Sequence, residues 1–182
     1  MGLDMYLTRR TYVSPEERKN IKVTGINKPI DPAKVEYITE EVGYWRKANQ
    51  IHRWFVENVQ DGEDDCKSYT VSREQLQELL ATVNKVLDAS KLVKGMVGNG
   101  YTYEKDASGQ MVRTPIMEDG QYIADPTFAK ELLPRQEGFF FGGLGYDQWY
   151  VEDLKETQKI LTAALSDEDD GYYSDYQYQS SW

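Results

Sequence analysis

The sequence predicts an α+β fold: a single domain over residues 1–182, with about three main helices packed on a small mixed or antiparallel sheet. Two observations predict this class. Segments in which apolar residues recur every three or four positions are interspersed with short segments rich in tyrosine, valine and phenylalanine, which are typical of amphipathic helices and of strands respectively. No Pro/Gly/Ser-rich linker divides the chain, and its length is typical of one domain of about 100–200 residues.

The range 44–59 predicts the helix around which the other elements pack. Successive residues of a helix lie about 100° apart, so one narrow arc holds five residues of this range: Tyr44, Ala48, Ile51, Phe55 and Val59. Polar residues lie on the opposite side. The helix is expected to end at Gly62, because glycine adopts the left-handed conformation that closes a helix without a side-chain penalty.

Two further long helices are predicted from their starts. Ser72 and Gln75 form a capping-box pattern, in which each side chain bonds a backbone amide at the helix start, and apolar residues then recur at spacings of three and four: Leu76, Leu79, Leu80, Val83, Val86 and Leu87. Asp147 can cap a third helix, whose apolar positions are Trp149, Tyr150, Leu154, Ile160, Leu161 and Leu165. A short helix is expected between Asp125-Pro126 and Pro134.

Strands are expected where β-branched and aromatic residues lie between turn signals such as Ser14-Pro15. The range 35–42 is ambiguous, because its valine, tyrosine and threonine suit a strand whereas its glutamates suit a helix; the strand is favoured. The glycine-containing segment 105–109 separates two extended segments, 101–104 and 110–114, which predicts a hairpin. The remaining expected strands are 3–7, 21–26, 68–71, 139–143 and 176–182.

Composition excludes several classes of protein. The formal net charge of −10 argues against direct high-affinity binding of nucleic acid, which depends on Lys and Arg at phosphates. No apolar run approaches the about 20 residues of a membrane-spanning helix. The single cysteine, Cys66, cannot form an internal disulfide, and the first residues lack the pattern of a signal peptide, so we expect a reducing, intracellular setting.

No catalytic residue, cofactor site or metal site is predicted. The only histidine, His52, falls inside the apolar arc of its helix, which favours a hydrogen-bonded core residue over a catalyst. A pocket beside Trp45 that uses His52, or a Cys66–His52 pair, stays open as an alternative. The acidic loop after the first helix fails the EF-hand pattern, since Cys66 and Ser72 stand where Gly and Glu are required. The glycine-rich segments match neither phosphate-binding fingerprint.

Two acidic segments are the predicted partner-binding surfaces. The first is the loop after the helix 44–59, with Asp61, Glu63, Asp64 and Asp65. The second is the acidic, tyrosine-rich segment 166–182, with Asp167, Glu168, Asp169, Asp170, Tyr172 and Tyr173. Carboxylates attract cationic partners, and mixed with aromatic rings they can imitate the charge and stacking surface of nucleic acid. The alternative is a solvated tail in which Tyr178 and Trp182 close the core as a last strand.

Several short sequence segments along the chain resemble those of a known group of proteins. They are Gly2-Leu3-Asp4-Met5-Tyr6-Leu7, Tyr44-Trp45-Arg46-Lys47-Ala48-Asn49, His52-Arg53-Trp54-Phe55, Gly138-Phe139-Phe140-Phe141-Gly142, Tyr146-Asp147-Gln148-Trp149-Tyr150 and Tyr178-Gln179-Ser180-Ser181-Trp182. Together they resemble a family of small proteins encoded by phages and prophages, mostly without an assigned activity. The ranges 25–36 and 94–123 depart from that pattern as variable insertions, where features particular to this chain are expected.

Within such families, the chain is similar to type II-A anti-CRISPR proteins, inhibitors of the Cas9 nuclease. That resemblance implies a non-enzymatic protein that binds Cas9 with its guide RNA in the bacterial host cytoplasm and blocks target DNA binding or cleavage. An acidic, aromatic-rich protein is compatible with the positively charged channels of Cas9. Two alternatives stay open: a small enzyme with a pocket around His52, and an accessory protein that acts by self-association as a homo-oligomer.

Overall fold

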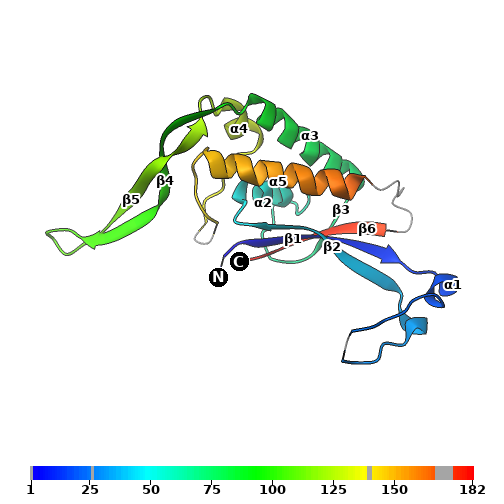
Figure 1. Cartoon of the computed structure of the whole chain (residues 1–182). Helices are drawn as coiled ribbons and strands as arrows, with labels where there is room; N and C mark the ends of the chain where they lie inside the picture. The colour runs from blue at the N-terminus through cyan, green and yellow to red at the C-terminus, as the bar shows by residue number, and fades with distance from the viewer. Residues whose placement is uncertain (1, 26, 139–140, 167–173) are drawn as a thin grey trace.

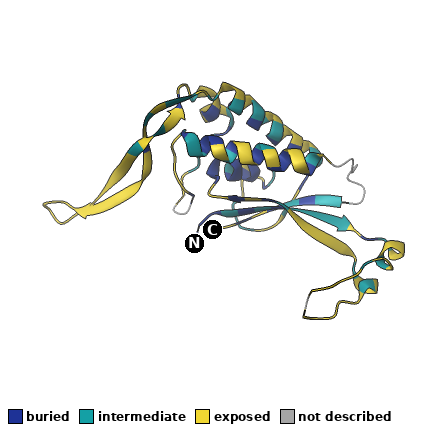
Figure 2. Ribbon diagram, viewed as in Figure 1, coloured by how far each residue is buried: buried dark blue, intermediate teal, exposed yellow. Residues whose placement is uncertain are grey.

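The computed structural model describes residues 2–25, 27–138, 141–166 and 174–182. It confirms the α+β class: three longer helices lie over one face of a four-stranded sheet, and a separate two-stranded hairpin extends from the helical side (Figure 1). The longer helices are α2 (Asn49–Asn58), α3 (Arg73–Ala89) and α5 (Gln148–Leu165). The core lies between the helices and the sheet, where Figure 2 shows the buried residues gathered.

The sheet is antiparallel throughout. Its strand order is β2 (Tyr37–Arg46), β1 (Asp4–Tyr12), β6 (Ser174–Ser181) and β3 (Tyr69–Val71). Asp4 of β1 pairs with Ser181 of β6, so the two termini lie side by side (Figure 1). The predicted strands 3–7, 35–42, 68–71 and 176–182 are therefore confirmed, each with shifted bounds.

The predicted helix 44–59 is wrong in its first turn. Tyr44, Trp45 and Arg46 belong to β2 and pair with β1, and the chain reverses at Lys47, whose φ of 61° lies in the left-handed region. The helix begins only at Asn49, because pairing with β1 satisfies the backbone of the preceding residues. The predicted end is confirmed: Gly62 has φ 83° and its amide donates to Val56 O.

The caps of the other helices follow the prediction. Ser72 and Gln75 form both bonds of the capping box at α3, and Asp147 accepts from the amides of Trp149 and Tyr150 at α5. The short helix is α4 (Thr127–Leu132). Each capping side chain accepts from a backbone amide no more than three residues further along the chain. The local sequence is therefore sufficient to place the cap.

Two arms extend beyond the core. The first is the hairpin of β4 (Leu92–Lys105) and β5 (Met111–Ile123), which confirms the predicted hairpin and lengthens it. The second consists of the outer halves of β1 and β2 with α1 (Pro15–Arg18) and the 3-10 helix η1 (Pro32–Lys34). Figure 2 shows most residues of both arms exposed. The first arm contains residues 94–123, and the second contains residue 25 and residues 27–36; these are the ranges in which features particular to this chain are expected.

Two predicted strands differ from the structure. Residues 21–25 form no strand, and residue 26 lies outside the described residues; the Ser14-Pro15 turn instead starts α1, with a second capping box between Ser14 and Glu17. Of the predicted strand 139–143, residues 139 and 140 lie outside the described residues, and residues 141–143 are not a strand. Phe141 is buried there, and a side chain of α2, described below, donates to its carbonyl.

Candidate interaction surface

One side of the outer hairpin is aromatic and basic. Register pairs Tyr101 with Pro115, Tyr103 with Arg113 and Lys105 with Met111, and paired residues of antiparallel strands point to the same side. We call these six residues the arm face. Its tyrosines and methionine are exposed: Tyr101 by 45%, Tyr103 by 60% and Met111 by 58%. Exposed side chains of this size, grouped on one face, are typical of a contact surface.

Arg113 is held against its neighbour on the arm face. Its guanidinium carbon lies 3.4 Å from the centroid of the Tyr101 ring, within the range of a cation–π contact. This contact places the positive charge of Arg113 beside the exposed Tyr101 ring. The contact therefore presents a positioned cation rather than a freely moving one.

The turn at the end of the hairpin is closed by its own hydrogen bonds. Asp106 accepts from the amide and hydroxyl of Ser108 and from the amide of Gln110, while Gly109 adopts φ 84°. The hydrogen bonds from Ser108 and the backbone lower the pKa of Asp106 below its ordinary value. The carboxylate of Asp106 is thus directed into the turn and not onto the arm face.

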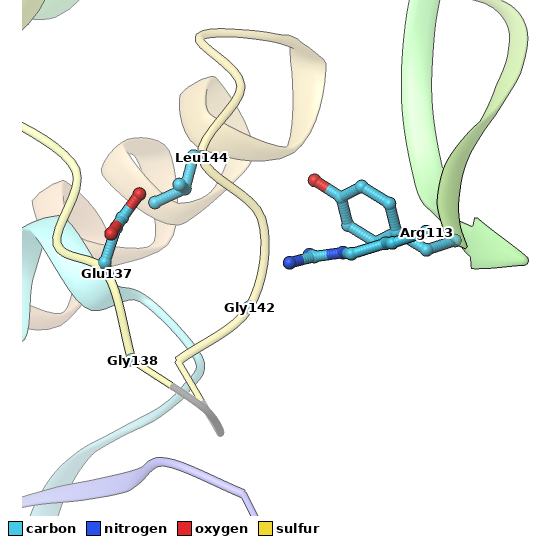
Figure 3. Close-up of a pocket in the computed structure, with 6 residues that line it drawn as sticks. Arg113, Glu137, Gly138, Gly142 and Leu144 are labelled. Atoms are coloured by element: carbon cyan, nitrogen blue, oxygen red, sulfur yellow. The ribbon is translucent and has the colours of Figure 1, made fainter. Parts of the chain in front are cut away.

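A hollow of about 430 Å³ separates the inner end of the arm face from the loop before α5. It is lined by Tyr101, Arg113, Glu137, Gly138, Gly142 and Leu144. In Figure 3 Arg113 extends from β5 towards that loop, which carries Glu137 and Leu144 on the other side. The hollow has the volume of a small-molecule site and holds one cation and one carboxylate.

Asn49 at the start of α2 positions the loop that lines this hollow. Its side chain is fully buried; Nδ2 donates to Phe141 O (2.8 Å) and Gly143 O (3.0 Å), and Oδ1 accepts from the amide of Gln136 (3.2 Å). A buried amide side chain satisfies three backbone groups of a segment that has no strand or helix of its own. Sequence analysis missed this role, since a single Asn in a helix carries no signal for it.

A second polar cluster holds the same loop from Arg135. Nη1 of Arg135 donates to Gln50 Oε1 (2.7 Å) and lies 3.3 Å from Asp153 Oδ2, while Gln50 Nε2 donates to the same Asp153 oxygen (3.0 Å). Burial raises the pKa of Asp153 above its ordinary value, opposed by the bond from Gln50 and the charge of Arg135. Arg135 Nε donates to Gly145 O, so the cluster joins the loop to α2 and α5.

The acidic loop after α2 divides into two exposed and two engaged residues. Asp61 and Glu63 are exposed. Asp64 accepts from His52 Nε2 through Oδ2 and from Trp182 Nε1 through Oδ1, both at 2.9 Å. Asp65 bonds Lys67 and Tyr69, and the bond from Lys67 lowers the pKa of Asp65. Asp61 and Glu63 are therefore the exposed carboxylates of this predicted surface, whereas Asp64 and Asp65 are half-buried and bonded within the chain.

His52 is a hydrogen-bonded core residue. It is 0% exposed, and Nδ1 lies 2.8 Å from the hydroxyl of Tyr178, whose ring stacks on Phe55 with centroids 3.9 Å apart. Burial raises the pKa of Tyr178, so its phenol stays protonated. The carboxylate of Asp64 is an acceptor, so Nε2 of His52 donates to it. Both ring nitrogens are thereby engaged, and neither is left for Cys66.

The remaining predicted contact residues belong to the C-terminal segment. Tyr178 is buried in β6, which confirms the last-strand alternative for this ring. Trp182 follows the strand and is 45% exposed, so the prediction that it closes the core is wrong. The other predicted contact residues lie outside the described residues: Asp167, Glu168, Asp169, Asp170, Tyr172 and Tyr173. Within the described part of the chain, no three His, Cys, Asp or Glu side chains form a group suited to a metal ion.

Comparisons with protein-family models, curated proteins and solved structures gave no match to this chain. Among the described helices none has the length and apolar character needed to cross a bilayer. What the described residues define is therefore a class: an α+β domain with a hydrogen-bonded core and two exposed arms. Its most distinctive surface is the arm face.

Proposed function

We propose that the protein is a non-enzymatic inhibitor that binds a bacterial Cas9 with its guide RNA in the host cytoplasm, and that it prevents target DNA binding or cleavage. The target comes from the sequence resemblance to anti-CRISPR proteins. The binding mode is supported by one observation above the others: a hairpin that leaves the core and exposes tyrosine, methionine and arginine at its end. These residue types are enriched where proteins contact one another.

Exposing the apolar side chains of such a hairpin to water is unfavourable in free energy, and a bound partner would cover them. This supports a binding role. Two-stranded hairpins are marginally stable in water, and large apolar side chains gain free energy when a partner covers them, about 25 cal/mol for each Å² of apolar surface. In this chain Tyr103 and Met111 lie far out on the arm and are largely exposed. A rigid, closed turn keeps them in place, which lowers the entropy cost of binding.

The charge of the chain supports a cationic target. Its net charge of −10 favours approach to the positively charged channels of Cas9, and Asp61 and Glu63 are the described carboxylates of the predicted acidic loop that face solvent. Long-range attraction of this kind raises the association rate at low salt and weakens as salt is added.

A cleavage assay tests the proposal. The protein is titrated against preassembled Cas9–guide complex before labelled target DNA is added, and co-elution is followed on a sizing column. Inhibition with co-elution supports the proposal. Full cleavage by several Cas9 orthologues at saturating protein would refute it. Substitution of Tyr103 and Met111 by Ser is the interface variant, and Thr102→Ala on the other side of the hairpin is its control.

Self-association is the second candidate, because the other arm offers a suitable edge. β2 is an edge strand ten residues long, and Tyr37 and Ile38 near its outer end are exposed. A long edge with exposed apolar residues is a template for pairing with another chain. Light scattering over a range of concentrations decides: a rising mass, together with no effect on any nuclease, favours this function over inhibition.

A further inference from the structure

The arm face differs in charge from the rest of the chain. Its two charged residues, Lys105 and Arg113, are both cations, whereas the chain as a whole has 31 acidic and 21 basic residues. The nearest carboxylates of the hairpin are turned elsewhere: Glu104 alternates to the other side of β4, and Asp106 bonds the turn. The arm face is thus a small cationic surface on an acidic protein.

Two exposed rings accompany these cations. Tyr101 and Tyr103 are two residues apart on β4, so their side chains stand on the same side about 6.6 Å apart along the strand. Arg113, held against Tyr101, adds a third flat group, which carries positive charge. Aromatic rings beside Arg and Lys on a β-surface are the arrangement on which unpaired bases stack while their phosphates meet cations.

The hollow next to the arm face continues the same surface. Its volume of about 430 Å³ accommodates a base with its sugar, and both Arg113 and Glu137 line it, with the backbone near Gly142 running between them in Figure 3. A carboxylate accepts hydrogen bonds from an exocyclic amino group such as that of cytosine. Stacking on Tyr101 and a phosphate at Arg113 are close enough to be satisfied by one nucleotide.

The outer end of the arm face lies far from the acidic core, which weakens the repulsion between the core and a bound strand. Val97 is the last buried residue along β4, and Tyr103 lies six residues further out, about 20 Å away along the strand. At physiological salt charges are screened over about 8 Å. The negative charge of the core therefore acts only weakly on a strand bound at Tyr103 and Lys105, whereas Glu137 lies in the hollow beside Tyr101 and Arg113.

We propose that the arm face binds single-stranded nucleic acid, with bases stacked on Tyr101 and Tyr103 and phosphates at Lys105 and Arg113. An acidic peptide would also find the two cations, but it would leave two exposed rings and the carboxylate of Glu137 without complementary groups. The site goes beyond the proposed function, because it binds a strand whether or not Cas9 is the target.

The test is fluorescence anisotropy of a labelled single-stranded oligocytidine of about 12 nucleotides, a length within known site sizes. The full chain is expected to bind it at low salt. Tyr101→Ala and Tyr103→Ala should each weaken binding about tenfold, as loss of one stacked base does. Arg113→Ala should lower the slope of log K against log salt by about 0.7. Thr102→Ala, on the other side of the hairpin, should change neither value.

Three outcomes would overturn the proposal: no anisotropy change at low salt, binding unaffected by Tyr101→Ala and Tyr103→Ala together, or stronger competition by polyglutamate than by unlabelled oligocytidine. The last outcome would assign the arm face to an acidic protein. Circular dichroism of each variant confirms that the fold is kept. Cas9 inhibition by the unsubstituted chain is measured in parallel. Inhibition without strand binding removes this proposal alone, and strand binding without inhibition removes only the proposed function.

Discussion

The indole Nε1 of Trp182 donates to Asp64 Oδ1 at 2.9 Å, which fixes the residue after β6 to the loop after α2. The other oxygen of Asp64 accepts from buried His52, so one carboxylate joins the C-terminal strand, a helix and a loop. A residue predicted to contact a partner is therefore part of the intramolecular bonding of the fold. This relationship leads to the first two predictions.

Asp64→Ala should destabilise the fold by about 1–3 kcal/mol, because it leaves the buried Nε2–H of His52 without an acceptor. Asp64→Asn should cost less, since its amide oxygen can still accept one bond. Urea unfolding measures both. The matched control is Glu63→Ala in the same loop, which is exposed and should change stability by less than about 0.5 kcal/mol. Equal unfolding midpoints for the two Ala variants would contradict the assignment.

His52→Ala should lower the melting temperature, because it removes the partner of both Tyr178 and Asp64 and leaves a cavity beneath the sheet. Any binding or inhibitory activity should survive in the folded fraction. The enzyme alternative makes the opposite forecast, a normally folded variant without function. Thermal unfolding and activity at a temperature well below the transition separate the two.

Asn49→Ala should destabilise the protein by about 1–3 kcal/mol and loosen the loop that lines the hollow. The substitution removes the donor to Phe141 O and Gly143 O and the acceptor of the Gln136 amide. The rate of hydrogen exchange at the Gln136 amide measures how readily the loop opens. Chemical denaturation measures the change in the free energy of unfolding. Asn99→Ala, at an exposed position of the hairpin, serves as the control. Unchanged exchange in Asn49→Ala would show that the loop is held by other contacts.

Stability should fall as pH rises above about 10, the ordinary pKa of tyrosine. Burial raises the pKa of both Tyr150 and Tyr178, so these phenols ionise in the unfolded chain before they ionise in the folded one. Each contributes a slope of up to about 1.4 kcal/mol per pH unit in that range. Tyr150→Phe should reduce the slope, as measured by urea unfolding at several alkaline pH values. A slope equal to that of the parent would refute the linkage.

Replacing Asp167, Asp169 and Asp170 together by Asn should weaken binding to the Cas9–guide complex and flatten its salt dependence, if the acidic tail meets a cationic surface. Inhibition titrations at two salt concentrations measure both effects. Asp61→Asn with Glu63→Gln removes charge from the other acidic segment. This variant shows whether the effect depends on which acidic segment is neutralised. Unchanged inhibition by the tail variant would remove the tail from the mechanism.

The sequence alone identifies only part of the candidate contact surface. Acidic segments are visible as runs of carboxylates, but whether a carboxylate faces a partner depends on which donors the fold brings to it. Asp64 and Asp61 are three residues apart in one loop, yet only Asp64 meets an indole from the other end of the chain. The arm face could not be predicted from the sequence for the same reason. Tyr101 and Arg113 come together only through the register of β4 and β5.

By itself, the sequence determined the class of fold, the caps at Ser72 and Asp147, the closing glycine after α2 and the existence of the hairpin. Each depends on hydrogen bonds or on periodicity within a few residues, so neighbouring side chains are sufficient to specify it. Tertiary structure alone decided that Tyr44–Arg46 pair as a strand and that His52 bonds both Tyr178 and Asp64. Those outcomes depend on partners distant in sequence, whose positions are set only when the sheet and helices pack together.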